Sequence, residues 1–310
     1  MTKIQLIQAV ALAALLAVTA GCPVDVNEGD GMTDDGSSNA ECMSSELATV
    51  RIMHAAGGTP VTRPQFLPPT TRNLNVTRPD PKDATKTLTV TSLAPGRASL
   101  VQLCGNKPLM LGARLAGAKA DRTTQMVTLT PDADPTKFEP NLTIVLAGIS
   151  DDLKSDGTPE NPKSAADPLR FILVPNTFGA SPDTEIQVVH ASRKTPALVD
   201  VETNPDRTGA EITALARYAI SALGPTKGTP DTAPATVPIV FLEGTTTRAS
   251  FTITPRIPAG AKALAIHFDT EVFDPGNPDM AGQNPAPIAR LFLTGNDPLL
   301  GRVAGGGIQF

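Results

Sequence analysis

Residues 49–60, TVRIMHAAGGTP, and residues 185–196, EIQVVHASRKTP, are two versions of one sequence, and this duplication decides the fold. His190 aligns with His54, and Ala, Thr and Pro coincide at the same offset on the carboxyl side of the histidines. Self-similarity of this kind is typical of a structural unit that the chain uses more than once. The sequence therefore predicts one module in tandem, with repeat 1 over residues 46–178 and repeat 2 over residues 179–310.

Four further echoes follow in the same order along the two halves. They are Leu74-Asn75-Val76 with Val199-Asp200-Val201, Leu93-Ala94 and Ser99 with Leu215-Ala216 and Ser221, TLTP at 128–131 with TITP at 252–255, and LRFILVPN at 169–176 with IARLFLTGN at 288–296. Conserved order makes coincidence a poor explanation. The boundary between the repeats is expected in the NTFGASP stretch around residues 176–182.

Short apolar runs bounded by Pro, Gly, Asn and Asp dominate both halves, and they alternate or are β-branched at strand length. Runs such as TLTVTSL, ASLVQLC, QMVTLT and LTIVLAGI are typical of an all-β, antiparallel β-sandwich. The segment EITALARYAISAL at 211–223 has the Ala and Leu spacing of a short helix, but its place in the repeat favours a strand and a turn. We expect little helix.

The segments VRIMHAA and IQVVHAS, followed by Val199-Asp200-Val201, resemble a bacterial domain-of-unknown-function family whose first strand reads V-R-V-V-H-A-S-P and continues into V-D-V. The resemblance covers nearly all of residues 46–310. It implies tandem immunoglobulin-like sandwiches in an exported envelope or surface protein, and it implies no biochemical activity. Gly57 and Arg193 stand where the family has Pro, and Asn75 replaces the acid of V-D-V in repeat 1.

The amino terminus resembles that of an exported bacterial lipoprotein. Lys3 is followed by an apolar run to Ala20, shorter than the roughly 20 apolar residues that span a bilayer. VTAGC at 18–22 resembles the lipobox, with Thr19 where Leu is usual, so residues 1–21 are expected to be removed and Cys22 to be lipidated. An ordinary signal peptide with a coincidental Cys is the alternative.

Residues 22–45 are predicted to be an acidic tether, because the stretch PVDVNEGDGMTDDGSSNAE has six acidic and no basic residues and cannot bury enough apolar area to fold. Pro23 after the lipidated Cys, by resemblance to lipoprotein sorting, indicates the outer membrane. Cys42 and Cys104 remain in a compartment where disulfides persist, so they are expected to pair. Two buried free thiols are the alternative.

His54 and His190 are the repeated residues with catalytic potential. Residues of equal parity share one face of a strand, so His54 lies with Val50 and Ile52 on the expected core face, and both histidines are predicted to be structural. A ligand or catalytic role is the alternative. No zinc-binding spacing, nucleophile elbow or phosphate loop is present, and Asp151-Asp152 falls in a polar loop. We expect no metal and no cofactor.

The composition of the chain disfavours two classes of binding partner. The chain has 26 basic and 31 acidic residues without a basic run, which disfavours nucleic acid, and no Trp and one Tyr, which disfavours a stacking sugar site. The sequence thus predicts a lipid-anchored, non-catalytic structural, adhesive or assembly module of the cell envelope. Its partner is expected to be another envelope protein or a surface polymer. A small-molecule carrier and an exported hydrolase are the alternatives.

Overall fold

The computed structural model describes most residues of the two predicted repeats. The described residues are 42–57, 73–134, 140–149, 167–176, 184–193, 195–203, 209–222, 224–225, 237–253, 262–269 and 287–294. The predicted signal segment 1–21, Cys22, most of the tether and Asp151-Asp152 lie outside the described residues. Among the residues that are described, no helix has the length and apolar character needed to cross a membrane.

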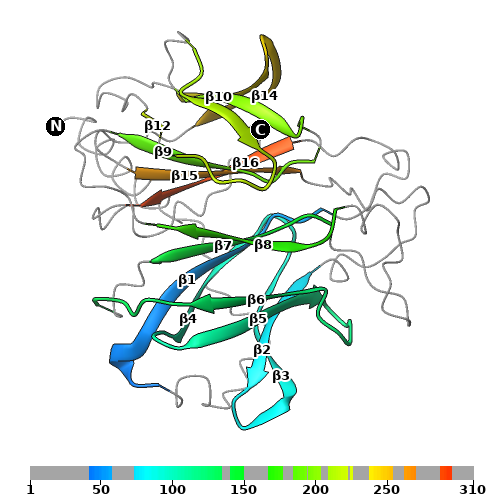
Figure 1. Ribbon diagram of the computed structural model, residues 1–310, viewed down its shortest axis with the longest axis vertical. Coiled ribbons are helices and arrows are strands. Elements are labelled where there is room, and N and C mark those ends of the chain that lie inside the picture. The colour runs from blue at the N-terminus through cyan, green and yellow to red at the C-terminus, as the bar shows by residue number, and fades with distance from the viewer. Residues whose placement is uncertain are drawn as a thin grey trace, which may run out of the picture. The chain divides into compact units, whose positions relative to one another are not determined.

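Repeat 1 is a β-sandwich of two four-stranded sheets. Its strands are β1 (Leu47–His54), β2 (Leu74–Asp80), β3 (Asp83–Leu93), β4 (Ala98–Cys104), β5 (Pro108–Leu115), β6 (Thr123–Thr128), β7 (Leu142–Ala147) and β8 (Arg170–Pro175). The sheet with the order β4-β1-β7-β8 is called inner sheet 1, and the sheet with the order β3-β2-β5-β6 is called outer sheet 1 (Figure 1).

Repeat 2 repeats this architecture strand for strand. Its strands are β9 (Glu185–His190), β10 (Leu198–Glu202), β11 (Ile212–Ala216), β12 (Gly224–Pro225), β13 (Val237–Glu243), β14 (Thr246–Ile253), β15 (Lys262–Asp269) and β16 (Pro287–Thr294). Inner sheet 2 has the order β12-β9-β15-β16 and outer sheet 2 the order β11-β10-β13-β14. Each strand thus neighbours the counterparts of the strands that it neighbours in repeat 1, with β3 and β4 corresponding to β11 and β12.

The core of each sandwich lies between its two sheets. In repeat 1, Val50 and Ile52 of β1 pack with Leu74 and Val76 of β2 and with Leu111 of β5. In repeat 2, the corresponding faces bring residues of β9, β10, β11, β13 and β15 together around the fully buried Phe241. The alternating pattern read from the sequence thus identifies the face of each strand that points into its own sandwich.

Each inner sheet contains a parallel pair, which the expectation of antiparallel sheets did not include. β1 is parallel to β7, and β9 is parallel to β15. Sheets with parallel strands are usually covered on both faces and built from continuous apolar runs, and β7 reads LTIVLA with five of its six residues buried. Both faces of the inner sheets are indeed covered.

A third apolar cluster joins the two repeats. It comprises residues of inner sheet 1 (Met53, Ala55, Val145, Ala147, Ile172 and Val174) and residues of inner sheet 2 (Val189, Ala191, Leu264, Ile266 and Phe268). The two sandwiches therefore share a buried layer, and residues Gly36–Phe310 form one compact unit. The sequence predicted two sandwiches but not this layer, because strand alternation was taken to leave one face of β1 and β9 outside a core.

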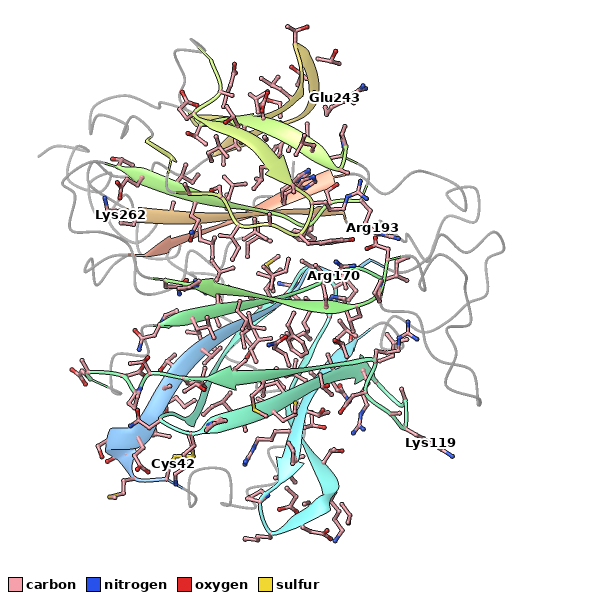
Figure 2. All side chains as sticks on the ribbon, viewed as in Figure 1. Cys42, Lys119, Arg170, Arg193, Glu243 and Lys262 are labelled. Carbon is pink, nitrogen blue, oxygen red and sulfur yellow. A yellow bond between two sulfur atoms is a disulfide. The ribbon has the colours of Figure 1, made fainter. Side chains whose placement is uncertain are left out.

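Two local expectations can be compared with the structure directly. The segment at 211–223 contains β11 and a turn, as the repeat predicts, and no helix. Cys42 and Cys104 form a disulfide, and a short 3₁₀ helix, η1 (Ser44–Glu46), follows Cys42 (Figure 2). Residues 42–45, which were assigned to the tether, thus belong to the folded repeat, because the disulfide fixes them to β4.

Candidate functional site

The two repeated histidines occupy equivalent places at the ends of β1 and β9. His54 is 1% exposed and His190 is 0% exposed. In each repeat a β-turn hydrogen-bonds to the histidine backbone: Gly96 N–H donates to the His54 carbonyl at 2.7 Å, and Tyr218 N–H donates to the His190 carbonyl at 2.6 Å. Because the neighbouring residues Ile52 and Val188 belong to the sandwich cores, neither ring lies on an outer surface.

Repeat 2 contains a second buried histidine beside the first. His267 on β15 pairs in register with His190 on β9, and the two rings stack with centroids 5.6 Å apart. His190 Nε2 donates to the Pro196 carbonyl at 2.8 Å. His267 Nε2 shares a hydrogen bond of 2.6 Å with the Thr195 hydroxyl. The loop between β9 and β10 is thereby fastened to the core through both rings.

The hydrogen-bond network of the two histidines continues from the Thr195 hydroxyl to Ser192. Thr195 N–H donates to Ser192 Oγ at 3.1 Å, and the two hydroxyl groups are also 3.1 Å apart. A hydroxyl beside an imidazole has the composition of a nucleophile and a base, which must face a substrate to act. Here His190, Ser192 and His267 are all 0% exposed. The arrangement is therefore suited to holding a loop, and its groups have no open side on which a substrate could bind.

Sequence reasoning identified His190 but missed its neighbour. The position equivalent to His267 in repeat 1 is Leu146, since Ala55 N–H bonds to the Leu146 carbonyl and Ala191 N–H bonds to the His267 carbonyl. The sequence carries no identity there that could have marked His267. Aligning LTIVLAGI with ALAIHFD by their apolar pattern would have brought it next to His190.

The acid of the V-D-V segment has a backbone partner. Asp200 Oδ1 accepts a hydrogen bond of 2.7 Å from Ala214 N–H, and Ala214 has a left-handed backbone with φ of 53°. The pairing of β10 with β11 is irregular at this point. In repeat 1, Asn75 instead pairs in register with Ser92. Asn75 in repeat 1 thus lies where β2 and β3 pair regularly, from Leu74 to Val76, whereas Asp200 stabilises an irregular pairing.

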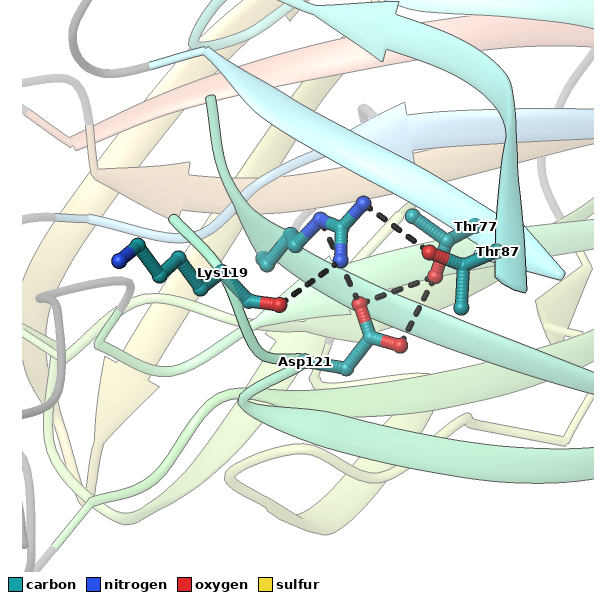
Figure 3. Close-up of polar contacts among 5 residues, drawn as sticks. Thr77, Thr87, Lys119 and Asp121 are labelled. Atoms are coloured by element: carbon teal, nitrogen blue, oxygen red, sulfur yellow. Dashed lines mark hydrogen bonds and ion pairs between the residues drawn. The ribbon is translucent and has the colours of Figure 1, made fainter. Parts of the chain in front are cut away.

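A polar cluster on the outer face of outer sheet 1 is the other concentration of charged groups (Figure 3). Thr77 Oγ1 of β2 donates to the Asp121 carboxylate, with distances of 2.9 and 3.0 Å to its oxygens. Arg114 Nε lies 3.8 Å from Asp121 Oδ1, and its guanidinium also donates to the Lys119 carbonyl and the Thr87 hydroxyl. A Cβ on Gly112 would lie 2.2 Å from Asp121 Oδ2, so glycine is required there for the carboxylate to approach.

The Asp121 carboxylate thus interacts with neighbouring residues of its own sheet, and these contacts hold the turn between β5 and β6 against β2. We expect Asp121→Ala to lower the free energy of unfolding by about 2 kcal/mol, because the fully buried Thr77 hydroxyl would lose its acceptor. Chemical denaturation measures this. Asp83→Ala is the matched control, since Asp83 is exposed and pairs with Lys86, so its loss should change stability far less than the loss of Asp121. Equal effects of the two substitutions would contradict the assignment.

No group of three or more metal-ligating side chains occurs within the described ranges. The sequence matches no protein-family model, and no curated protein matches it significantly. The resemblance to the V-R-V-V-H-A-S-P family therefore stays a hypothesis that rests on the residues quoted for it.

Proposed function

We propose that this chain is an exported lipoprotein of the bacterial cell envelope, anchored through lipid on Cys22, in which the two repeats form a non-catalytic structural, adhesive or assembly module. The observation that carries the proposal is the disulfide between Cys42 and Cys104. Disulfides form and persist in oxidising compartments, so this bond supports export independently of the amino-terminal sequence. The bond accounts for two of the three cysteines of the chain, and Cys22 is the third.

The position of the disulfide fits the proposed anchor. Cys42 directly follows the acidic stretch that ends at Glu41, and it ties the first residues of the folded part to β4. As a flexible coil, the residues between Cys22 and Cys42 would span about 24 Å on average. In the proposed arrangement this stretch holds repeat 1 away from the lipid headgroups, and the acyl chains hold the whole chain at the membrane.

The burial of the histidines supports a module without chemistry. His54 and His190 are enclosed in the sandwich cores, and the Asp121 and Asp200 carboxylates accept hydrogen bonds from neighbouring groups of the chain. Such groups stabilise loops and strand irregularities. In this proposal the recognition of another envelope protein or a surface polymer is a property of the outer sheets and their loops.

The test is replacement of the proposed lipidation site. Cys22→Ala should abolish incorporation of labelled palmitate and should move the protein from the membrane fraction to a soluble or unprocessed form. The double variant Cys42→Ala/Cys104→Ala is the matched control, because it removes two cysteines and should keep the label. Absence of label from the native chain would refute the anchor, whereas label that survives in Cys22→Ala would place the lipid elsewhere.

A further inference from the structure

The two repeats bury the same face against each other. Met53 and Ala55, at the end of β1, and their equivalents Val189 and Ala191, at the end of β9, all belong to the cluster that joins the inner sheets. A contact in which both partners use the same surface is the arrangement of a symmetric homodimer, where residue i of one partner meets equivalent surface on the other. Two identical repeats could satisfy it, but these two are not identical on this face.

Equivalent positions on the shared face differ in size, and in most of them repeat 2 has the larger side chain. The register of β1 with β7, and of β9 with β15, aligns these positions. The pairs, with repeat 1 first, are Thr143 and Leu264, Ala147 and Phe268, Ala98 and Ile220, Gly57 and Arg193, and Gly96 and Tyr218. Met53 and Val189 form the opposite case. On this face, repeat 2 thus has the larger side chains, and the smaller residues of repeat 1 leave room for them.

Gly57 and Arg193 are equivalent residues, and they contact each other across the shared face. A Cβ built on Gly57 would lie 3.0 Å from Arg193 Nη2 and 3.7 Å from its Cζ, so the guanidinium occupies the volume next to Gly57. These are the two positions at which the chain departs from the Pro of the resembled family. An arginine in one repeat therefore matches a glycine in the other.

Gly96 and Tyr218 are the second unequal pair, and the larger one adopts a strained conformation. Both are the third residue of an equivalent β-turn, with φ of 71° and 66°. Glycine adopts this left-handed region freely, whereas a side chain costs about 1–2 kcal/mol there. The contacts of the Tyr218 side chain must therefore contribute enough free energy to offset the strain of its backbone.

Those contacts are made with repeat 1. The Tyr218 hydroxyl donates to Asp167 Oδ2 at 2.6 Å, and the Arg170 guanidinium lies over the Tyr218 ring, 4.1 Å from its centroid. Asp167 and Arg170 are themselves paired at 3.3 Å. Burial, together with the hydrogen bond to Asp167, raises the pKa of Tyr218 well above its ordinary value, so the hydroxyl remains a donor at neutral pH.

We propose that the shared face is a matched, non-interchangeable interface: repeat 2 is shaped to seat on repeat 1 of its own chain and not on another repeat 2. Two repeat 2 faces would oppose Arg193 to Arg193, which combines overpacking with repulsion of like charges, and Tyr218 would lose the Asp167 and Arg170 partners that repeat 1 supplies. Two repeat 1 faces would leave a gap between Gly57 and Gly57. The occupant of each inner sheet is therefore the other repeat, and the tandem acts as one closed unit.

The test is a size exchange between the two contacting equivalents, made in the full chain. Gly57→Arg should lower the midpoint of thermal unfolding by about 5 °C, because two arginines would then compete for one volume. Arg193→Gly alone should lower it by about 3 °C. The variant that carries both substitutions should unfold within about 2 °C of the native chain, because one arginine again faces one glycine. Gly57 has no positive φ, so a side chain is compatible with its backbone.

The matched control is Arg248→Ala, which removes an exposed arginine of β14 that pairs with Glu243 and should shift the midpoint by less than about 1 °C. If Gly57→Arg does not fold, Gly57→Ala with and without Arg193→Gly gives the same comparison, with a smaller shift expected. Two results would overturn the proposal: a double variant whose loss equals the sum of the single losses, and a Gly57→Arg variant as stable as the native chain.

Discussion

Replacing Cys42 and Cys104 together with Ala should lower the free energy of unfolding by roughly 4 kcal/mol. The disulfide joins residues 62 apart in the sequence, and the entropy that such a loop removes from the unfolded chain gives that magnitude. The bond closes one end of repeat 1, where Leu47 pairs with Cys104 and Gly105 N–H donates to the Glu46 carbonyl at 2.7 Å. Denaturation by guanidinium would report the loss as a lower midpoint.

Reducing agent provides the control for this prediction. It should destabilise the native chain to about the level of the double variant, and it should have no effect on the double variant itself. Alkylation of the exported protein without denaturant should modify neither cysteine. Two reactive thiols in that experiment, or a loss below about 1 kcal/mol in the double variant, would show that the bond is absent or does not constrain the unfolded chain.

The strands of each repeat could be predicted because their signals are local. The TVRIMHAA and EIQVVHAS segments placed the first strand of each half, and the order of the later echoes placed the others. Pro95 and Gly96 form a β-turn between β3 and β4 because Pro fixes its own φ and Gly takes a positive φ. Such features depend on a few neighbouring residues, so a single sequence displays them.

The contact between the repeats could not be predicted in the same way. Alternation along β1 separates Ile52 from Met53, but it does not say whether the second face meets solvent or another sheet. The run LTIVLA of β7 was the available signal, because continuous apolar strands are typical of sheets covered on both sides. Tyr218 illustrates the same limit: its left-handed backbone is explained by Asp167 of the other repeat, 51 residues away in the sequence.

The positions at which the two repeats differ in sequence are positions at which their side chains have different structural roles. Gly57 and Arg193 could not both be large, since they contact each other, and Tyr218 has partners in Asp167 and Arg170 of repeat 1. In the sequence, Gly57 and Arg193 look like the loss of a site common to both repeats. In the structure, the small residue of one repeat makes room for the large residue of the other. Asn75 is a different case, because Asp200 in repeat 2 stabilises an irregular pairing at a position where Asn75 of repeat 1 pairs in register with Ser92.

The second large effect is expected at the buried histidines of repeat 2. His190→Gln should lower the free energy of unfolding by 1–3 kcal/mol, on the order of the cost of a buried polar group left without its hydrogen bond. The Pro196 carbonyl would lose the donor that now lies 2.8 Å away, and the stack with His267 would be broken. His54→Gln should have a similar effect in repeat 1, because its ring is equally enclosed.

His267→Leu separates a structural role from a chemical one, because leucine is the residue that repeat 1 places at the equivalent position, Leu146. A buried leucine keeps the packing against Phe241, whose ring centroid lies 4.2 Å from that of His267. The Thr195 hydroxyl retains Ser192 as a partner at 3.1 Å. We therefore expect a smaller loss for His267→Leu than for His190→Gln, about 1 kcal/mol, with membrane attachment and partner capture unchanged in the folded fraction of both variants. The opposite result would be variants that unfold as the native chain does but no longer capture the partner. It would make the histidine pair a binding site, since the loss of a group that only holds the β9–β10 loop in place must lower the free energy of unfolding.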